Sequence, residues 1–145
     1  MLPSLKLGLS FTFEYKVPPE RTVPFLLPES PEFQQMPQVL ATGYMVGLFE
    51  WACIQALKPH LDWPREQSVG TQVRLSHVAA TPPGLTVSIS GELIEIKGRR
   101  LLFAMQGHDG VELISKGTHG RYIIDAARFN EKAGAKQAAA MGKAP

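Results

Sequence analysis

The chain has 145 residues, of which 44% are hydrophobic, and a formal net charge of +2. This length suits a single domain spanning residues 1–145, and the composition supports a packed core. Lys and Arg are scattered, which argues against nucleic-acid binding, and no apolar stretch of about 18 residues is free of charge, so we expect no membrane-spanning helix and no membrane partner.

The N-terminal segment predicts a long strand. Odd positions from Leu5 to Val17 are apolar, whereas the even positions are mostly polar. Alternation of this kind is typical of a strand with one buried face. Lys6 and the other polar residues interrupt the apolar run that a secretory signal needs, so we expect no signal peptide.

A proline-rich but apolar segment follows at residues 17–40. Its six prolines forbid a continuous helix or a central strand. The large apolar side chains between these prolines make it an unsuitable solvated linker. We expect an irregular flap that lies against an apolar surface, with a short helical turn at Pro31–Gln35 capped by Ser30.

The segment from Ala41 to Leu57 is apolar on almost every side and predicts a buried central helix that ends near Pro59. Glu50 lies in its middle. A carboxylate in a core is costly unless it is paired and hydrogen-bonded, so Glu50 needs a partner, a wet cleft or a chemical role.

The remainder of the chain predicts four more strands and a short helix. Turn signals separate the runs Val69–Ala79, Leu85–Ile96, Arg99–Gly107 and Val111–Ile124. Connections this short predict antiparallel hairpins between successive runs. A change of apolar parity near Gly91–Leu93 predicts a bulge or bend. Asp125 can cap a last helix that runs to Lys132, and we expect residues 132–145 to be frayed or loosely helical.

These elements predict an α+β domain in which a curved five-stranded antiparallel sheet wraps around one long central helix. The apolar flap and the helix ends leave surface to cover, so we expect a homodimer, with a higher oligomer left open. Cys53 is the single cysteine, which excludes an internal disulfide and suits a cytoplasmic location.

Three polar residues on apolar elements are the candidate catalytic residues: Thr42, Glu50 and His77. Alternation along Val69–Ala79 places His77 with the apolar set that faces the helix, where it and Glu50 can supply each other's polar partner. A core histidine bonded to a carbonyl also explains His77, and a simple N-cap also explains Thr42. Gly43 lies on the same side of the helix as Glu50, which permits close approach of a ligand or tight helix–sheet packing.

The other candidate motifs are weak. His60, His108 and His119 have no metal-like spacing with Cys, Asp or Glu, so we expect no metal site. No phosphate-binding loop, dinucleotide-binding glycine pattern or nucleophile elbow is present.

The chain resembles the hotdog-fold acyl-CoA thioesterases, and among them the fluoroacetyl-CoA thioesterase family. The resemblance is carried by the segments VPPERTV, PESPEF, ATGYMVGLFEWAC, VGTQVRLSHVAATPPGLTV and HDGVELISKGTH. It implies the hotdog fold and hydrolysis of a short-chain acyl-CoA, with fluoroacetyl-CoA as one candidate. It also implies a Thr42, Glu50 and His77 catalytic set and no cofactor besides the CoA of the substrate.

The resemblance further implies a substrate pocket at a homodimer interface. Gly70 would lie at the thioester and Arg121 near the acyl group. The residues expected to line or cover the acyl group are Val23, Leu26, Phe33, Met36 and Gly43. The family has an aromatic residue where this chain has Met36, and this difference bears on selectivity for a fluorinated acyl group.

Two other functions fit the same layout. Hotdog hydratases and dehydratases have an Asp and a His early on the helix, whereas this helix carries Glu50 and no His. A non-catalytic acyl-CoA-binding hotdog module would not need Thr42, Glu50 and His77 together.

Overall fold

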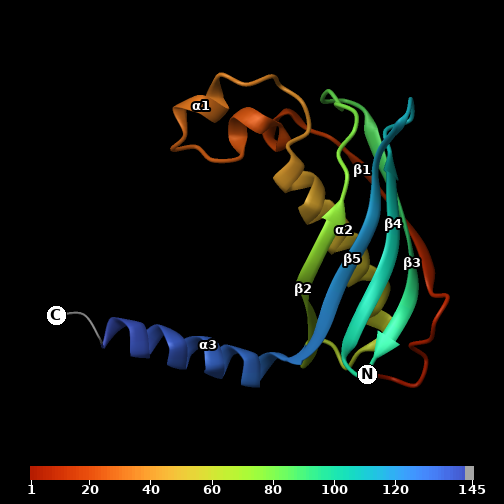
Figure 1. Ribbon diagram of the computed structural model, residues 1–145, viewed down its shortest axis with the longest axis vertical. Helices are drawn as coiled ribbons and strands as arrows, with labels where there is room; N and C mark the ends of the chain where they lie inside the picture. Colours follow the sequence, from red (N-terminus) through yellow and green to blue (C-terminus); the bar gives the residue numbers. More distant parts are fainter. Residues whose placement is uncertain (143–145) are drawn as a thin grey trace.

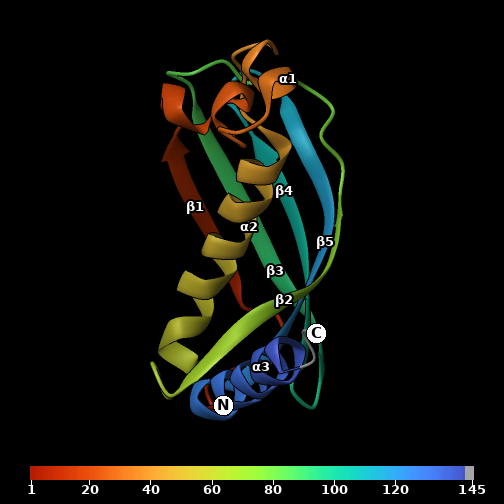
Figure 2. The same ribbon diagram turned by 90° about the vertical axis from the view of Figure 1, so that its left-hand side faces the viewer.

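The computed structural model describes residues 1–142. Its five strands form one antiparallel sheet in the order β1-β3-β4-β5-β2. The strands are β1 (Ser10–Lys16), β2 (Glu66–Leu75), β3 (Thr86–Lys97), β4 (Arg100–His108) and β5 (Leu113–Asp125). The sheet curls around the long helix α2 (Thr42–Leu57), which lies along its concave side (Figures 1 and 2). The predicted α+β architecture is confirmed.

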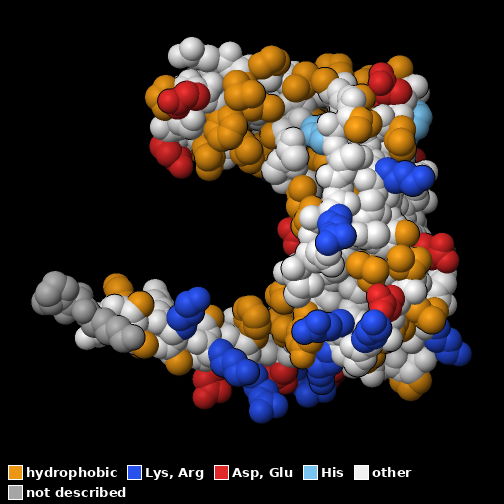
Figure 3. Space-filling view, viewed as in Figure 1, with side chains coloured by type: hydrophobic (Ala, Val, Ile, Leu, Met, Phe, Trp, Pro, Cys, Tyr) orange, Lys and Arg blue, Asp and Glu red, His pale blue; other side chains and the backbone are white. Residues whose placement is uncertain are grey.

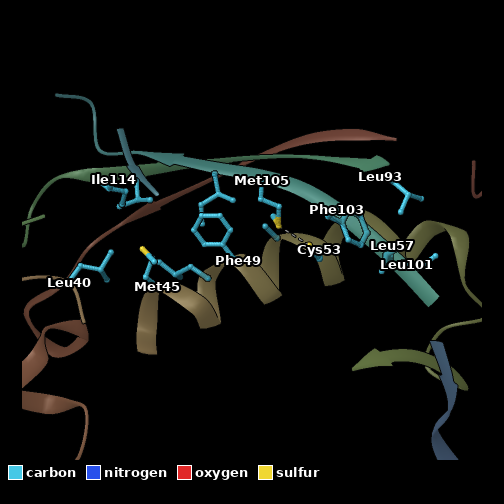
Figure 4. Packing of buried hydrophobic residues seen from close by; sticks show 14 of the residues in the cluster. Leu40, Met45, Phe49, Cys53, Leu57, Leu93, Leu101, Phe103, Met105 and Ile114 are labelled. Atoms are coloured by element: carbon cyan, nitrogen blue, oxygen red, sulfur yellow. Dashed lines mark hydrogen bonds between the residues drawn. The ribbon is translucent and has the colours of Figure 1, made fainter. Parts of the chain in front are cut away.

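Helix α2 packs on the sheet through one side only. Met45, Phe49, Cys53 and Leu57 are buried, and Figure 4 shows them opposite apolar side chains of the sheet, with Cys53 beside Met105. The opposite side of the helix is open in the single chain. The expectation of a helix buried all round is therefore wrong, because five strands enclose only part of its circumference.

The pairing of β2 differs from the predicted hairpins. β2 pairs with β5, whereas β3 pairs with β1 and β4. The segment after β2 therefore crosses to the far side of the sheet instead of turning back beside β2. The hairpins β3–β4 and β4–β5 and the predicted bulge in β3 are confirmed, since the β3–β4 register shifts between Leu93 and Glu95.

β1 is shorter than the sequence pattern predicts, and β2 is shifted toward the N-terminus, since it begins at Glu66 rather than Val69. β1 begins at Ser10 rather than Leu5, because Gly8 takes a positive φ of 86° that turns the chain before the strand. β2 ends at Leu75 rather than Ala79. Its register with β5 also shifts between Gly70 and Gln72, an unpredicted bulge that changes which residues face the helix.

The flap consists of two 3-10 turns, η1 (Pro19–Arg21) and η2 (Val23–Phe25), and a short helix α1 (Pro31–Gln34). Ser30 caps α1 as predicted, since its hydroxyl accepts a hydrogen bond from the backbone N–H of Phe33 at 3.2 Å. The flap lies beyond the N-terminal end of α2 (Figure 2).

The last helix, α3 (Ala126–Met141), projects from the body of the molecule (Figure 1). Asp125 caps it as predicted, accepting a hydrogen bond from the backbone N–H of Arg128. The helix continues well past Lys132 to Met141, so the helical alternative for the tail holds over these residues and the frayed one does not. The final part of that expectation, residues 143–145, lies outside the described residues. Within residues 1–142 no helix is long and apolar enough to cross a bilayer.

Candidate active site

Thr42 and His77 form a direct pair at the start of α2. The N-cap of α2 is Ala41, so the Thr42 hydroxyl is not used for capping. It lies 2.8 Å from His77 Nδ1 instead. His77 follows the end of β2, where backbone hydrogen bonds from Ser76 and Val78 to β5 fix the chain on either side of it. The main chain is therefore fixed on both sides of His77, and the Thr42 hydroxyl contacts its ring.

The second nitrogen of His77 has no hydrogen-bond partner among residues 1–142. Nε2 is buried and makes no hydrogen bond in the described chain. Buried polar atoms are nearly always satisfied, so such an atom marks a place where a ligand or a partner molecule belongs. Burial also lowers the pKa of His77, which keeps the imidazole neutral near neutral pH and able to accept a proton.

Glu50 pairs with Arg121 and not with His77. Glu50 Oε2 accepts a hydrogen bond from Arg121 Nη1 at 3.1 Å, and no hydrogen bond joins Glu50 to His77 among the described residues. The predicted Glu50–His77 contact is therefore wrong. Thr42 and Glu50 are about 12 Å apart along the helix axis at ~1.5 Å per residue, so each finds its own partner on the sheet.

Arg121 is the most buried charge of this site. Only 2% of its side chain is exposed, against 40% for Glu50. Its Nε and Nη2 donate to the hydroxyl and the carbonyl of Ser68, at 2.8 and 2.7 Å. Its Nη1 also lies 3.0 Å from His119 Nε2. This saturation by close partners is what allows a guanidinium to be buried.

Gly70 lies directly against the Glu50–Arg121 pair. A Cβ at this position would come within 2.9 Å of Glu50 Oε2 and 3.4 Å of His119 Cε1. Only a glycine lets the carboxylate sit this close to β2. The residue that the resemblance places at the thioester therefore borders Glu50.

The flap is anchored to the first turn of α2. The Tyr44 hydroxyl donates to the carbonyl of Phe25 at 3.0 Å. A Cβ on Gly43 would lie 3.2 Å from both methyl groups of Leu26, so the two residues are in close contact. Val23 and Phe33 are half-buried, and Met36 is 47% exposed at the end of the flap. Met36 is therefore open to solvent in the single chain.

Thr42 is exposed, and Glu50 keeps 40% of its side chain exposed, so both can be reached from solvent in the single chain. The molecule is hollowed between the flap and α3 (Figure 3). Among residues 1–142 no three His, Cys, Asp or Glu side chains gather as a metal site requires.

Sequence reasoning missed Ser68 and His119 as parts of the site. One signal was available for His119. His119, Arg121 and Ile123 share one parity on β5, and all three are buried. Two polar residues at alternate positions from an apolar isoleucine on one strand point to the same face as the isoleucine, so they form an inward-facing polar pair.

The fold is that of a hotdog protein. A solved hot-dog-like protein from Thermanaerovibrio acidaminovorans has the same fold at 16% identity, with a TM-score of 0.74 and 93% of each chain covered. More similar proteins identify the family. The model of the fluoroacetyl-CoA-specific thioesterase family, FlK, matches residues 19–127.

Two close relatives agree with this match. The curated fluoroacetyl-CoA thioesterase of Streptantibioticus cattleyicolor is 50% identical over 132 residues, which cover 91% of this chain and 94% of the relative. The solved structure of the fluoroacetyl-CoA thioesterase FlK is 47% identical, with a TM-score of 0.87 and coverage of 98% and 99%. The chain belongs to the fluoroacetyl-CoA-specific thioesterase family and is an acyl-CoA thioester hydrolase.

Proposed function

We propose that the chain hydrolyses a short-chain acyl-CoA to the free acid and CoA, with fluoroacetyl-CoA as the candidate substrate, and that Thr42, Glu50 and His77 carry the reaction. The name of the curated relative supports the substrate. The observation that carries the residue assignment is the 2.8 Å contact between Thr42 and His77, whose second nitrogen is buried and free.

The Thr42–His77 contact is that of a hydroxyl nucleophile beside a general base. The Thr42 oxygen attacks the thioester carbonyl while His77 takes its proton. The carbon–sulfur bond then breaks, and His77 returns the proton to the departing CoA thiolate. Water attacks the acyl-threonine next and loses a proton to His77. The bond between the acyl carbon and the Thr42 oxygen then breaks, and His77 returns the proton to that oxygen, which releases the acid and restores Thr42.

Glu50 is assigned the water-directing role. Helical side chains lean toward the helix N-terminus, the end at which Thr42 lies. The hydrogen bond from Arg121 fixes the carboxylate in one orientation. An alternative route has Glu50 attack the carbonyl to form an anhydride. Acylation of Thr42 in the Glu50→Gln variant, detected by mass spectrometry, supports the first route, whereas an acylated Glu50 in the unaltered enzyme supports the second.

Turnover of the active-site variants tests the assignment. Glu50→Gln and His77→Ala are expected to lower kcat by about 10²–10⁴-fold, the usual contribution of a positioned acid or base. His108→Ala is the matched control, since His108 is an exposed histidine at the β4–β5 turn. Thiol release from acetyl-, propionyl- and fluoroacetyl-CoA measures the rates, and thermal unfolding checks the fold. Near-normal turnover by both variants contradicts the proposal.

We also propose that two copies form the functional unit in the cytoplasm, with the active site between them. The apolar residues left exposed around the open side support this assembly: Phe25, Leu27, Met36 and Trp51. Cys53 is free and buried, which suits a reducing compartment.

A further inference from the structure

One nitrogen of Arg121, Nη1, contacts both Glu50 and His119. Nη1 lies 3.1 Å from Glu50 Oε2 and 3.0 Å from His119 Nε2. The other donors of the guanidinium are directed at Ser68 on β2. Nη1 carries two hydrogens, so one can point to Glu50 and the other to His119.

This geometry fixes the protonation of His119. A guanidinium keeps its charge and has no acceptor, so His119 Nε2 must be the acceptor of the pair. The other ring nitrogen, Nδ1, lies 2.8 Å from the carbonyl oxygen of Gln72 and must be its donor. His119 is therefore the neutral tautomer with its proton on Nδ1, and an imidazolium would point an N–H at the N–H of Arg121.

The β2 bulge makes this arrangement possible. The register between β2 and β5 shifts between Gly70 and Gln72, next to the carbonyl that His119 uses. Gly70 leaves room for the imidazole edge and the Glu50 carboxylate side by side. The bulge and the glycine thus bring β2, β5 and α2 together around one guanidinium.

We propose that His119 is a positioning residue: its neutral Nε2 holds one hydrogen of Arg121 Nη1, so that the other is directed at Glu50. The inference rests on the proposed role of Glu50 in the reaction. His119 touches neither the Thr42–His77 pair nor, by this assignment, the reacting atoms. It acts through Arg121 on the orientation of the carboxylate.

The charges around His119 agree with a neutral ring. Burial lowers the pKa of His119 most, the charge of Arg121 lowers it further, and the Gln72 carbonyl and Glu50 act in the opposite direction. Besides Glu50, Cys53 is a titratable group near Arg121, and burial raises the pKa of its thiol to about 12, so it is uncharged. Ser68 and Gln72 from β2 are neutral. No group on these elements favours the imidazolium enough to offset burial and Arg121.

Two substitutions separate the two nitrogens of His119. His119→Gln places an acceptor near the position of Nε2 and loses the donor to Gln72. His119→Asn keeps a donor near Nδ1 and loses the acceptor for Arg121. We expect His119→Asn to lower kcat by about tenfold or more with little change in KM, and His119→Gln to stay within about threefold of the unaltered enzyme. A purely structural role predicts similar kcat for the two variants at equal thermal stability, and that result overturns the inference.

A double variant links the effect to Glu50. In the Glu50→Gln background His119→Asn should change the residual rate by less than about twofold, because the carboxylate that it positions is gone. An undiminished further loss in that background overturns the inference. Full activity of Glu50→Gln defeats the proposed role of Glu50, whereas an inactive Glu50→Gln beside a fully active His119→Asn defeats only the role of His119.

Nuclear magnetic resonance tests the inference without relying on a variant's activity. The chain has four histidines, and comparison with His119→Gln assigns the ring of His119. The ¹⁵N shifts of the labelled enzyme should show a neutral ring protonated at Nδ1 at pH 7. An imidazolium or an Nε2–H tautomer at pH 7 contradicts the proposed contact with Arg121.

Discussion

At the residue scale, the carboxylate of Glu50 avoids the cost of full burial because its ion-pair partner, Arg121, is the more deeply buried of the two. Glu50 keeps 40% of its side chain exposed, while Arg121 keeps 2%. A guanidinium suits the buried position better than a carboxylate, because its donors fit several acceptors at fixed angles. Here Ser68 and His119 supply the acceptors that Glu50 does not. The carboxylate thus stays accessible to a substrate without being free to rotate.

Gly70→Ala is expected to damage activity more than stability. The added Cβ would lie 2.9 Å from Glu50 Oε2 and would displace the carboxylate from Arg121. Loss of one charge-assisted hydrogen bond, at about 1.5–3 kcal/mol, predicts a fall in kcat of about tenfold or more. Thiol-release kinetics measure this change.

Gly91→Ala is the matched control for Gly70→Ala. Its Cβ would overlap the ring of Phe11, which faces it across β1 and β3, far along the sheet from Glu50. We expect this overpacking to lower Tm by a few degrees and to leave kcat unchanged. If kcat falls by the same factor per degree of Tm lost in both alanine variants, Gly70 has only a packing role.

At the scale of elements, the sequence predicted the features that depend on neighbouring residues. The α1 cap by Ser30, the end of α2 before Pro59 and the bulge in β3 follow from signals that lie within a few positions of each other. The central helix was also predictable, since its run from Ala41 to Leu57 is long, mostly apolar and contains no charged residue other than Glu50.

The features that depend on distant residues were not predictable in this way. The pairing of β2 with β5 joins strands about fifty residues apart, and short turns gave no information on it. The bulge at Gly70–Gln72 and the early end of β2 made the parity argument for His77 unsafe, although His77 still reaches α2 through Thr42. The partner of Glu50, Arg121, lies on β5, and the position of β5 beside Glu50 can be identified only once the sheet order is known.

Met36 in the flap offers a test of acyl selectivity. Met is flexible, whereas the resemblance implies a rigid aromatic residue at this position in the family. Met36→Phe is expected to raise the ratio of kcat/KM for fluoroacetyl-CoA over acetyl-CoA several-fold, because a stiffer side chain closes the flap with less freedom over a small acyl group. Steady-state kinetics with the two substrates give the ratio.

Leu27→Phe is the control for Met36→Phe. Leu27 is another exposed apolar residue of the flap, with an exposed fraction of 45% against 47% for Met36. It should leave the ratio unchanged. An equal rise of the kcat/KM ratio in both variants would mean that the effect comes from flap hydrophobicity in general. An unchanged ratio in Met36→Phe would mean that residue 36 has no role in substrate selection.

At the scale of the whole molecule, the single chain leaves its active side uncovered. β2 is an edge strand, and it is paired only with β5. It carries Gly70 and Ser68 of the site, and its residue Val73 is 46% exposed. An exposed edge strand offers unpaired backbone N–H and C=O groups to a second chain. Pairing of two β2 edges would bring two open sides together and exclude water from the thioester.

Val73→Lys tests this assembly together with its catalytic consequence. In solution the unaltered protein should have twice the 15.9 kDa of one chain, measured by light scattering after gel filtration. A lysine on the β2 edge opposes edge-to-edge pairing, so the variant should become monomeric and lose most of its turnover.

Val111→Lys is the control, because Val111 is also an exposed valine, at 73%, but lies in the β4–β5 turn. It should remain dimeric and active. A Val73→Lys protein that is monomeric and fully active would place the complete site within one chain, and one that remains a dimer would place the interface elsewhere.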